Sequence, residues 1–559
     1  MTTATVCVNI VATVYVDTSY TSQGGRIYAR YLLRDSYRQD GKVKHRTIAN
    51  LSACSAEEIA AIKLALKYKG DLAHLVNIKE IGTKEGMRIG AVFSLKTIAD
   101  RIGLTAALGS DQQGKLALWQ VQARLMGQGS RLSAVRLAES HAACDVLGLE
   151  TFNEDHLYGN LAWLAERQEV IEKRLFRQRY GSVAPQLFLY DVTSSYLEGV
   201  QNILAAFGYN RDGKEGKMQL VIGLLTGPEG APVVVRVFSG NTPDTKTVPE
   251  QVRILADSFG VKDVTLVGDR GMLKQTQTDL LNSEHFHYIT AITKPQIEKL
   301  LREGVFQMGL FEERLAEVAD GGVRYILRRN PERARELASS REAKLIKVKT
   351  LVEQKNIYLA RHPRARAAIA QRDIAAKVAQ LKIDDWAKVE IRGAVLELAL
   401  DDAAQKEAAK LDGCYVIKTD LPVEIASAKT VHDRYKDLAE VERAFRTFKN
   451  GHLEVEPTFV RTDKSTRGHV FVVMLAYLLE RELGQYWRGL ETTVAEGIDE
   501  LGSLRGVELA VGQATCQKVP EPTGLTKQLL DAADIRLPEV LPLRKVHVAT
   551  RKKLVPKRR

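Results

Sequence analysis

The sequence predicts an α/β protein whose core is a mixed sheet with helices packed against it. Short apolar segments rich in branched and aromatic residues recur between residues 186 and 293, and such segments are typical of buried strands. The second and third of them, KMQLVIGLL and APVVVRVF, are joined by a Gly-Pro-Glu-Gly turn, which favours antiparallel pairing. Helix-like segments separate the later ones, so the sheet is expected to be mixed and covered by helices.

Length and charge limit the classes of protein to which the chain can belong. At 559 residues it can form two to four domains of ordinary size. Its 81 lysines and arginines exceed the 69 acidic residues, which gives a formal net charge of +12. An excess of positive charge attracts polyanions such as nucleic acid or anionic lipid, although charge alone does not separate these partners.

Cysteines and apolar segments indicate the compartment. The five cysteines are scattered without a CxxC pair, which argues against a disulfide framework or a zinc ribbon and suits the reducing cytoplasm. The partly apolar N-terminus lacks the basic segment of a signal peptide, and we expect it to form a strand. The apolar run at residues 469–479 is too short to cross a bilayer. We therefore expect a soluble cytoplasmic protein without a membrane partner.

The first third of the chain divides into a strand region and a helical region. Within an N-terminal region of residues 1–55, residues 26–51 are expected to form a hairpin that turns at Asp40-Gly41. The basic residues of its second strand share one face, which favours a solvated surface over a DNA-contacting ribbon. Residues 56–180 are expected to be helical with basic faces, and we interpret them as a DNA-binding region.

The predicted sheet is interrupted by an insertion. The core occupies residues 181–294 and 411–455, and residues 295–410 form an inserted α+β subdomain. Most of the insertion is charged and helix-prone, which favours a solvated helical hairpin over an arm that grips DNA. Residues 456–515 are expected to be helical, and residues 516–559 to be a proline-containing linker and basic tail. The tail carries eight basic and no acidic side chains from Arg544 onward, so we expect it to hold DNA electrostatically rather than only to solubilise the chain.

Two aspartates interrupt the apolar pattern of the predicted strands. Asp191 follows the buried segment LFLY, and Asp269 follows TLVG. A carboxylate at the end of a buried strand is costly unless something neutralises it. If the two strands are neighbours in the sheet, both carboxylates face one gap at the same sheet edge. One such aspartate would be unremarkable, but the pair predicts a shared site.

A third acid lies on the predicted helix YKDLAEVERAFRTFKN. Tyr435, Glu442 and Lys449 are spaced seven apart, so they form one line along one face of a continuous helix. An adjacent apolar stripe would bury the helix against the core and hold this line beside it. An ordinary solvated face explains the same spacing, but it leaves the two aspartates unexplained.

Three carboxylates in one pocket repel one another unless cations lie between them. Oxygen ligands without histidine or cysteine favour Mg²⁺, with Mn²⁺ as a substitute, over zinc. Two such ions are a standard device for displacement at phosphorus, in which one activates the attacking oxygen and the other stabilises the leaving oxygen. The acids and the basic charge together predict phosphodiester cleavage or transfer on nucleic acid.

Five segments resemble the DDE transposases of bacterial insertion sequences, in the IS-four group and its IS-sixteen-thirty-four branch. They are YDVTSSYLEG, GYNRDGKEGKMQLVIGLL, FSGNTPDTKT, LVGDRGM and YKDLAEVERAFRTFK. The resemblance covers roughly residues 25–50 and 150–490, and it implies a ribonuclease-H-like catalytic core. The family signature around the third acid is Y-x2-R-x3-E-x6-K. This chain has Leu438 where the family has arginine, and Arg446, one turn past Glu442, could take its place.

The resemblance also implies residue roles. The catalytic acids and ligands of two Mg²⁺ ions would be Asp191, Asp269 and Glu442. The DNA-binding side chains would be Tyr435, Arg446, Lys449, Lys294 and Arg270.

A transposase of this family would act on double-stranded DNA in bacteria. It would bind the terminal inverted repeats of its element as a homodimer, cut the strands and join the freed 3′ ends to target DNA, in a cytoplasm where it associates with the nucleoid. Two alternatives remain open. One is a stand-alone metal-dependent nuclease, and the other is an inactive DNA-binding protein derived from a transposase.

Overall fold

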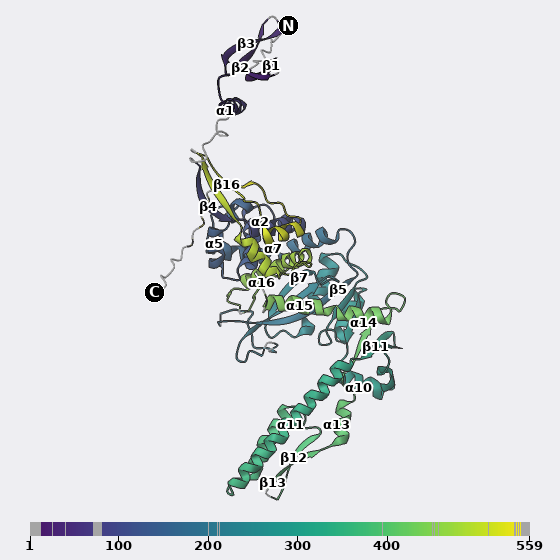
Figure 1. Cartoon of the computed structure of the whole chain (residues 1–559). Helices are drawn as coiled ribbons and strands as arrows, with labels where there is room; N and C mark the ends of the chain where they lie inside the picture. The colour runs from purple at the N-terminus through teal and green to yellow at the C-terminus, as the bar shows by residue number, and fades with distance from the viewer. Residues whose placement is uncertain are drawn as a thin grey trace. The chain divides into compact units, whose positions relative to one another are not determined.

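The chain divides into two compact units. The computed structural model describes residues 13–541 except 25, 40, 71–80, 200, 210, 212, 394, 450, 452, 457, 512 and 513, and beyond them residues 544, 546, 548 and 550. The smaller unit comprises Met1–Met87, Arg505–Glu521 and Pro538–Arg544, and the larger comprises Arg88–Leu504, Pro522–Leu537 and Lys545–Arg559 (Figure 1). Most of the expected basic tail lies outside the described residues.

In its described residues the smaller unit contains two sheets and one helix. The first sheet consists of β1 (Thr13–Gln23), β2 (Arg26–Gln39) and β3 (Lys42–Asn50), in that order, and it confirms the predicted hairpin. Helix α1 (Ala56–Lys67) begins at a capping box between Ser55 and Glu58. The second sheet has the order β17 (Val540–Leu541), β16 (Ala514–Lys518), β15 (Arg505–Val511) and β4 (Gly82–Arg88).

Strands in this second sheet contradict two expectations. Residues 82–88 were expected to be helical, and residues 505–518 to be helix and then linker, but both are strands. A Cβ on Gly86 would lie 2.7 Å from the backbone oxygen of Gly506, so strands β4 and β15 approach at a distance that only glycine permits. Strand β4, with the sequence GTKEGMR, contains two glycines and three charged residues, so it lacks the apolar alternation by which strands are recognised in a sequence.

An eight-stranded mixed sheet forms the centre of the larger unit. Its order is β10-β11-β14-β9-β8-β5-β6-β7. Strands β5, β6 and β7 are antiparallel, while β8 and β9 run parallel to β5. The mixed sheet and its covering helices are therefore as predicted. The strands are β5 (Leu187–Tyr196), β6 (Gln219–Thr226), β7 (Pro232–Ser239), β8 (Thr265–Gly268), β9 (His287–Ala291), β10 (Ala316–Asp320), β11 (Val323–Arg329) and β14 (Cys414–Thr419).

Helices cover both faces of this sheet. The helices that share one apolar core with it are α2 (Gly90–Arg101), α3 (Leu104–Leu108), α4 (Gln112–Met126), α5 (Arg131–Ser140), α6 (Ala143–Leu147), α7 (Glu154–Tyr180), α14 (Ala428–Lys436), α15 (Leu438–Lys449), α16 (Asp463–Tyr486), α17 (Val494–Ser503) and α18 (Gly524–Ala532). The opposite face packs on α8 (Val248–Arg253), η4 (Ile254–Ser258) and α9 (Gln275–Ser283). Three further short helices are η3 (Asp244–Lys246), α10 (Lys294–Arg302) and η5 (Met308–Phe311).

The helices after β4 share the apolar core of the central sheet, and their binding to DNA stays a prediction. Residues 116–125 of α4 are all buried, and α16 contacts both α4 and α7. An amphipathic pattern shows which face of a helix is buried but not which element covers it. The apolar run at residues 469–479 is the buried centre of α16. Within the described ranges, no helix is long and apolar enough to cross a membrane.

The insertion is smaller than predicted. Strands β10 and β11 extend the central sheet, because β11 pairs with β14 from Arg324↔Thr419 to Arg329↔Cys414. The rest forms a lobe with its own apolar core, which we call the α11–α13 lobe. It consists of α11 (Pro331–Arg361), α12 (Ala367–Gln380), β12 (Ala387–Arg392), β13 (Val395–Leu400) and α13 (Asp402–Ala409).

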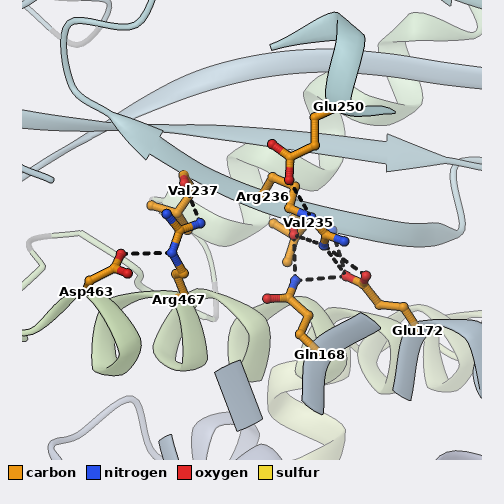
Figure 2. Close-up of polar contacts among 8 residues, drawn as sticks. All are labelled: Gln168, Glu172, Val235, Arg236, Val237, Glu250, Asp463 and Arg467. Carbon is orange, nitrogen blue, oxygen red and sulfur yellow. Dashed lines mark hydrogen bonds and ion pairs between the residues drawn. The ribbon is translucent and has the colours of Figure 1, made fainter. Parts of the chain in front are cut away.

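Strand β7 lies at the edge of the sheet, and side chains bond to its free backbone groups (Figure 2). Gln168 of α7 donates to the backbone oxygen of Val235 at 2.6 Å, and Arg467 of α16 donates to that of Val237 at 2.9 Å. The backbone N–H of Val235 donates to Glu172 at 3.3 Å. An open strand edge invites pairing with another strand. Here α7 and α16 occupy that edge with side chains.

A buried ion pair also joins α7 to strand β7. Arg236 Nη1 lies 2.9 Å from each carboxylate oxygen of Glu172, and Arg236 Nε lies 3.1 Å from Glu250. The side chains of Arg236 and Glu172 are only 6% and 1% exposed. The buried Glu172 carboxylate therefore depends on Arg236, and without Glu172 the buried Arg236 would keep only Glu250.

Removing Glu172 should destabilise the larger unit. We expect Glu172→Ala to cost about 3–5 kcal/mol, because it leaves Arg236 buried without its bidentate partner. The lowered midpoint of urea unfolding would measure this cost. Glu166→Ala is the matched control on the same helix, because the Glu166–Lys464 pair is exposed. Equal shifts for the two variants would contradict this account of the edge.

Candidate active site

The register between β5 and β8 brings Asp191 and Asp269 side by side. Tyr190 pairs with Gly268 in the parallel ladder, and each aspartate is the next residue of its chain. Leu189 and Val267, two residues earlier, both point into the core that contains α16. Because side chains alternate along a strand, the two aspartates follow on that same face.

Asp191 does not end its strand, contrary to the prediction. Strand β5 continues to Tyr196 because β6 pairs with it along this length, from Leu189↔Thr226 to Tyr196↔Gln219. It is β8 that ends, at Gly268. Asp191 therefore lies in the middle of one strand at the point where its other neighbour stops, which opens the sheet beside it.

Helix α15 places Glu442 over this opening. The helix packs against β5 through Val441, Phe445 and Phe448, which are buried, while Glu442 is exposed. Burial raises the pKa of Asp191 to about 7, and the negative charges of Asp269 and Glu442 add to this effect. The Val192 N–H donates to Asp191 Oδ1 at 2.8 Å, and this hydrogen bond partly opposes the rise in the pKa of Asp191.

Beyond the effect of burial, Asp269 and Glu442 raise the pKa of Asp191, but the three acids are not gathered into a ligand set among the described residues. Among the residues that the structure describes, no group of three or more histidine, cysteine, aspartate or glutamate side chains is arranged to hold a metal ion. Asp191, Asp269 and Glu442 are nevertheless the residues that could hold a metal ion, because Asp269 and Glu442 lie close enough to Asp191 to act on its charge.

The helix predicted to carry Tyr435, Glu442 and Lys449 is two helices. α14 ends at Lys436 and α15 begins at Leu438. The N–H of Asp437 bonds back to the oxygens of Asp433 and Arg434, which tightens the chain into a turn between them. Tyr435 therefore belongs to α14.

Tyr435 contacts one of the acids directly. Its hydroxyl donates to Asp269 Oδ1 at 3.3 Å. Burial and the charge of Asp269 raise the pKa of Tyr435, so the phenol keeps its proton and remains a donor. This bond orients the Asp269 carboxylate from the side of α14.

Lys449 does not face outward in line with Glu442, as the heptad spacing predicted. Its side chain is 10% exposed, and its Nζ lies 3.5 Å from Glu456, which is 7% exposed. The segment after α15 folds back, with the N–H of Val455 bonding to the oxygen of Phe448 at 2.6 Å. Arg446, one turn earlier on α15, is exposed.

A cleft of about 460 Å³ opens beside Asp269. Four residues of the predicted site line it, namely Asp269, Arg270, Lys294 and Tyr435. The start of α11 contributes Asn330 and Arg333, neither of which was predicted as a site residue. Asn330 caps α11 and Pro331 is its first residue, a pair that signals a helix start and could have located Arg333 in the first turn.

A second cleft, of about 360 Å³, lies at the other end of the same segment. Gly271 and Lys274 line it together with Arg211 and Asp244, which form an ion pair. The positive charge of Arg211 lowers the pKa of Asp191 against the larger effect of burial. The segment from Asp269 to Lys274 thus borders both clefts.

Comparison with known families identifies the chain. Residues 17–74 match the N-terminal domain of IS1634 family transposases, and residues 184–479 match the transposase DDE domain. The second match spans more than half of the 559 residues, so this protein belongs to the DDE transposases, within the IS1634 family. The resemblance noted in the sequence is confirmed, and a DDE domain implies a ribonuclease-H-like fold for the mixed sheet.

Other comparisons add little. A solved structure described as a piggyBac transposase synaptic complex with hairpin DNA is 9% identical, with a TM-score of 0.34, and the similarity covers 74% of this chain and 76% of that one. No match was found among curated proteins.

The buried pair of Lys449 makes it a stabilising residue. We expect Lys449→Met to lower the free energy of unfolding by about 1–3 kcal/mol, because it removes the lysine from a nearly buried carboxylate. Arg443→Met is the matched control on the same helix, since Arg443 is 64% exposed and pairs with nearby Glu440. If Lys449→Met weakened DNA binding without lowering the unfolding midpoint, the outward-facing arrangement would be the correct one.

Proposed function

We propose that this transposase binds the inverted repeats at the ends of its element, cuts DNA there and joins the freed ends to target DNA, using Asp191, Asp269 and Glu442. The observation that carries the proposal is the β5–β8 register, which puts two aspartates on one sheet face beneath the helix that bears the glutamate.

The donor chemistry of the three acids fits a hard divalent cation. A buried carboxylate beside two others is costly when all are ionised, and a cation removes that cost. Mg²⁺, or Mn²⁺ in its place, prefers oxygen ligands of this kind. The three carboxylates would hold two such ions, which supply an activated water and stabilise charge at phosphorus. Because the acids are not gathered into a ligand set among the described residues, we expect the site to assemble only with cation and DNA bound.

The cleft beside Asp269 is suited to a DNA strand. Arg270, Lys294 and Arg333 supply three cations along its wall, and cations on a groove track a phosphate backbone. Tyr435 positions Asp269 through its hydrogen bond. We also propose Arg446 as a DNA contact, because it is exposed on α15 one turn from Glu442. Two DNA ends must be held together for transposition, so the active complex is proposed to be a homodimer on bacterial DNA.

Neutral isosteres of the acids should separate binding from cleavage. We expect Asp191→Asn, Asp269→Asn and Glu442→Gln each to slow Mg²⁺-dependent nicking of end DNA roughly a hundredfold or more, because each removes a charge that the cations require. Affinity for end DNA should change less than about threefold, because the cations of the cleft, and not these acids, contact the phosphates. Glu440→Gln, an acid on the same helix paired with Arg443, should cleave normally. Full cleavage by Asp269→Asn would refute the assignment.

The same reaction distinguishes a transposase from a stand-alone nuclease. With target DNA and Mg²⁺ present, a transposase produces molecules in which element ends are covalently joined to target, whereas a nuclease leaves free ends. Sequencing of the products across the junction would detect the joined species. The absence of joined products alongside efficient cutting would favour the nuclease.

Arg333 should contribute to DNA affinity through charge. If it contacts one phosphate, Arg333→Ala should reduce the slope of log affinity against log salt by about 0.9, with similar losses for specific and random duplexes. Arg335→Ala is the control two residues along α11, because Arg335 is exposed but does not line the cleft. Equal slopes for Arg333→Ala and the unmodified chain would exclude Arg333 from the interface.

A further inference from the structure

The connection between β5 and β6 exposes large apolar side chains beside the candidate site. Ile203, Phe207 and Tyr209 are 81%, 70% and 81% exposed. Phe459, on the segment after α15, is 69% exposed. The two segments are tied together, because Leu197 bridges to Thr458. Apolar side chains gathered in this way indicate a binding surface more often than isolated ones do.

Residues 206–209 of this connection are held in place by backbone contacts. Ala206 and Gln219 exchange two backbone hydrogen bonds of 3.2 and 3.0 Å, and the Gln219 side chain donates to the backbone oxygen of Tyr209 at 2.9 Å. A Cβ on Gly208 would lie 2.1 Å from the oxygen of Gly240, so the chain passes closer there than any other residue allows. The backbone on both sides of Gly208 is therefore fixed, and it holds Phe207 and Tyr209 out into solvent.

One of the two anchored aromatic residues, Tyr209, lines the second cleft, and Phe207 lies two residues before it. Tyr209 lines that cleft together with Arg211 and Lys274, and the Arg211 guanidinium lies 5.7 Å from the centre of the Tyr209 ring. The two cations outnumber the one lining acid, Asp244. The cleft reaches the chain that follows Asp269 through Gly271. Aromatic faces and cations beside a strand-cleaving site are the combination that binds unpaired nucleotides, by stacking on bases and pairing with phosphates.

We propose that Phe207 and Tyr209 form a stacking platform for unpaired nucleotides next to the cleavage position, and that Arg211 and Lys274 contact their phosphates. This inference rests on the proposed function, since it names the form of DNA that the site accepts. It assigns the two clefts to opposite sides of the cut. Paired DNA would enter beside Arg270 and Lys294, and unstacked bases would leave beside Tyr209.

The test measures binding by the full chain without divalent cation, so that no cutting occurs. The probe is DNA with the sequence of the element's own end, prepared in two forms. One form is fully paired, and the other has unpaired bases next to the cleavage position. One of these unpaired bases is 2-aminopurine. Stacking quenches the fluorescence of this base. We expect the unmodified chain to quench it and the double variant Phe207→Ala/Tyr209→Ala to bind the unpaired form roughly tenfold more weakly. Affinity for the fully paired form should change less than about twofold.

Two further variants separate stacking from apolar contact with a second copy of the chain. Phe207→Leu/Tyr209→Leu keeps apolar surface but removes the rings, so a stacking platform predicts that it behaves like the alanine pair. Tyr209→Trp should retain quenching. Tyr158→Ala, which removes an aromatic residue 45% exposed on α7, should bind as the unmodified chain does. If the leucine pair binds normally while the alanine pair lowers the mass of the complex in light scattering, the surface holds a second copy and the proposal is overturned.

Failure of this inference can be told from failure of the proposed function. If the unmodified chain cuts end DNA when Mg²⁺ is added but the alanine pair binds the unpaired form equally well, only the stacking platform is wrong. If the unmodified chain neither prefers end DNA nor cuts it with Mg²⁺, the proposed function fails and the platform with it.

Discussion

The pairing of β5 with β8 is the constraint on which the candidate site depends. A shift of one residue between these strands would turn Asp191 and Asp269 toward opposite faces of the sheet. Packing between β5 and its other neighbour, β6, opposes such a shift. Tyr190 extends across Gly223 of β6, where a Cβ would lie 2.4 Å from the tyrosine hydroxyl. Any larger residue at Gly223 would displace Tyr190, and with it the strand that carries Asp191.

Features that depend on one segment and its nearest partners were predictable from the sequence. The acids at Asp191 and Asp269 stood out against apolar neighbours, and the stripe of Val441, Phe445 and Phe448 indicated that a helix would carry Glu442 against the core. The predicted strands of the core formed as expected because apolar pattern and turn chemistry agreed in each.

Features that depend on distant contacts were not predictable. Lys449 shares the heptad line of Glu442, yet the returning segment buries it against Glu456. The one-residue interruption at Asp437 leaves the apolar stripe of α15 intact, so the periodicity gave no sign of it. Arg333 reaches the cleft only because β11 and β14 are adjacent strands, which brings the start of α11 to the edge near Tyr415. Charge pattern alone could not separate it from the solvated residues that follow.

The α11–α13 lobe is attached to the sheet at a point where it does not disturb the candidate active site. The chain leaves the sheet after β11 and returns in β14, its antiparallel neighbour, so the α11–α13 lobe is attached at one end of two paired strands. Most of the lobe packs on its own core, around Val348, Ile374 and Trp386. Its length and sequence can therefore change beyond the first turn of α11 without moving β5, β8 or α15.

The side chains that close the edge of β7 also bear on how this domain is inherited. The family match begins at residue 184, but Gln168 and Glu172 lie before it on α7. A gene fragment that began at the match would encode a sheet with a bare edge and a buried arginine lacking its carboxylate. Such a fragment would be prone to pair with copies of itself. Recombination that moves this domain between genes must carry α7 along, so the unit of exchange extends beyond the part recognised by its signature.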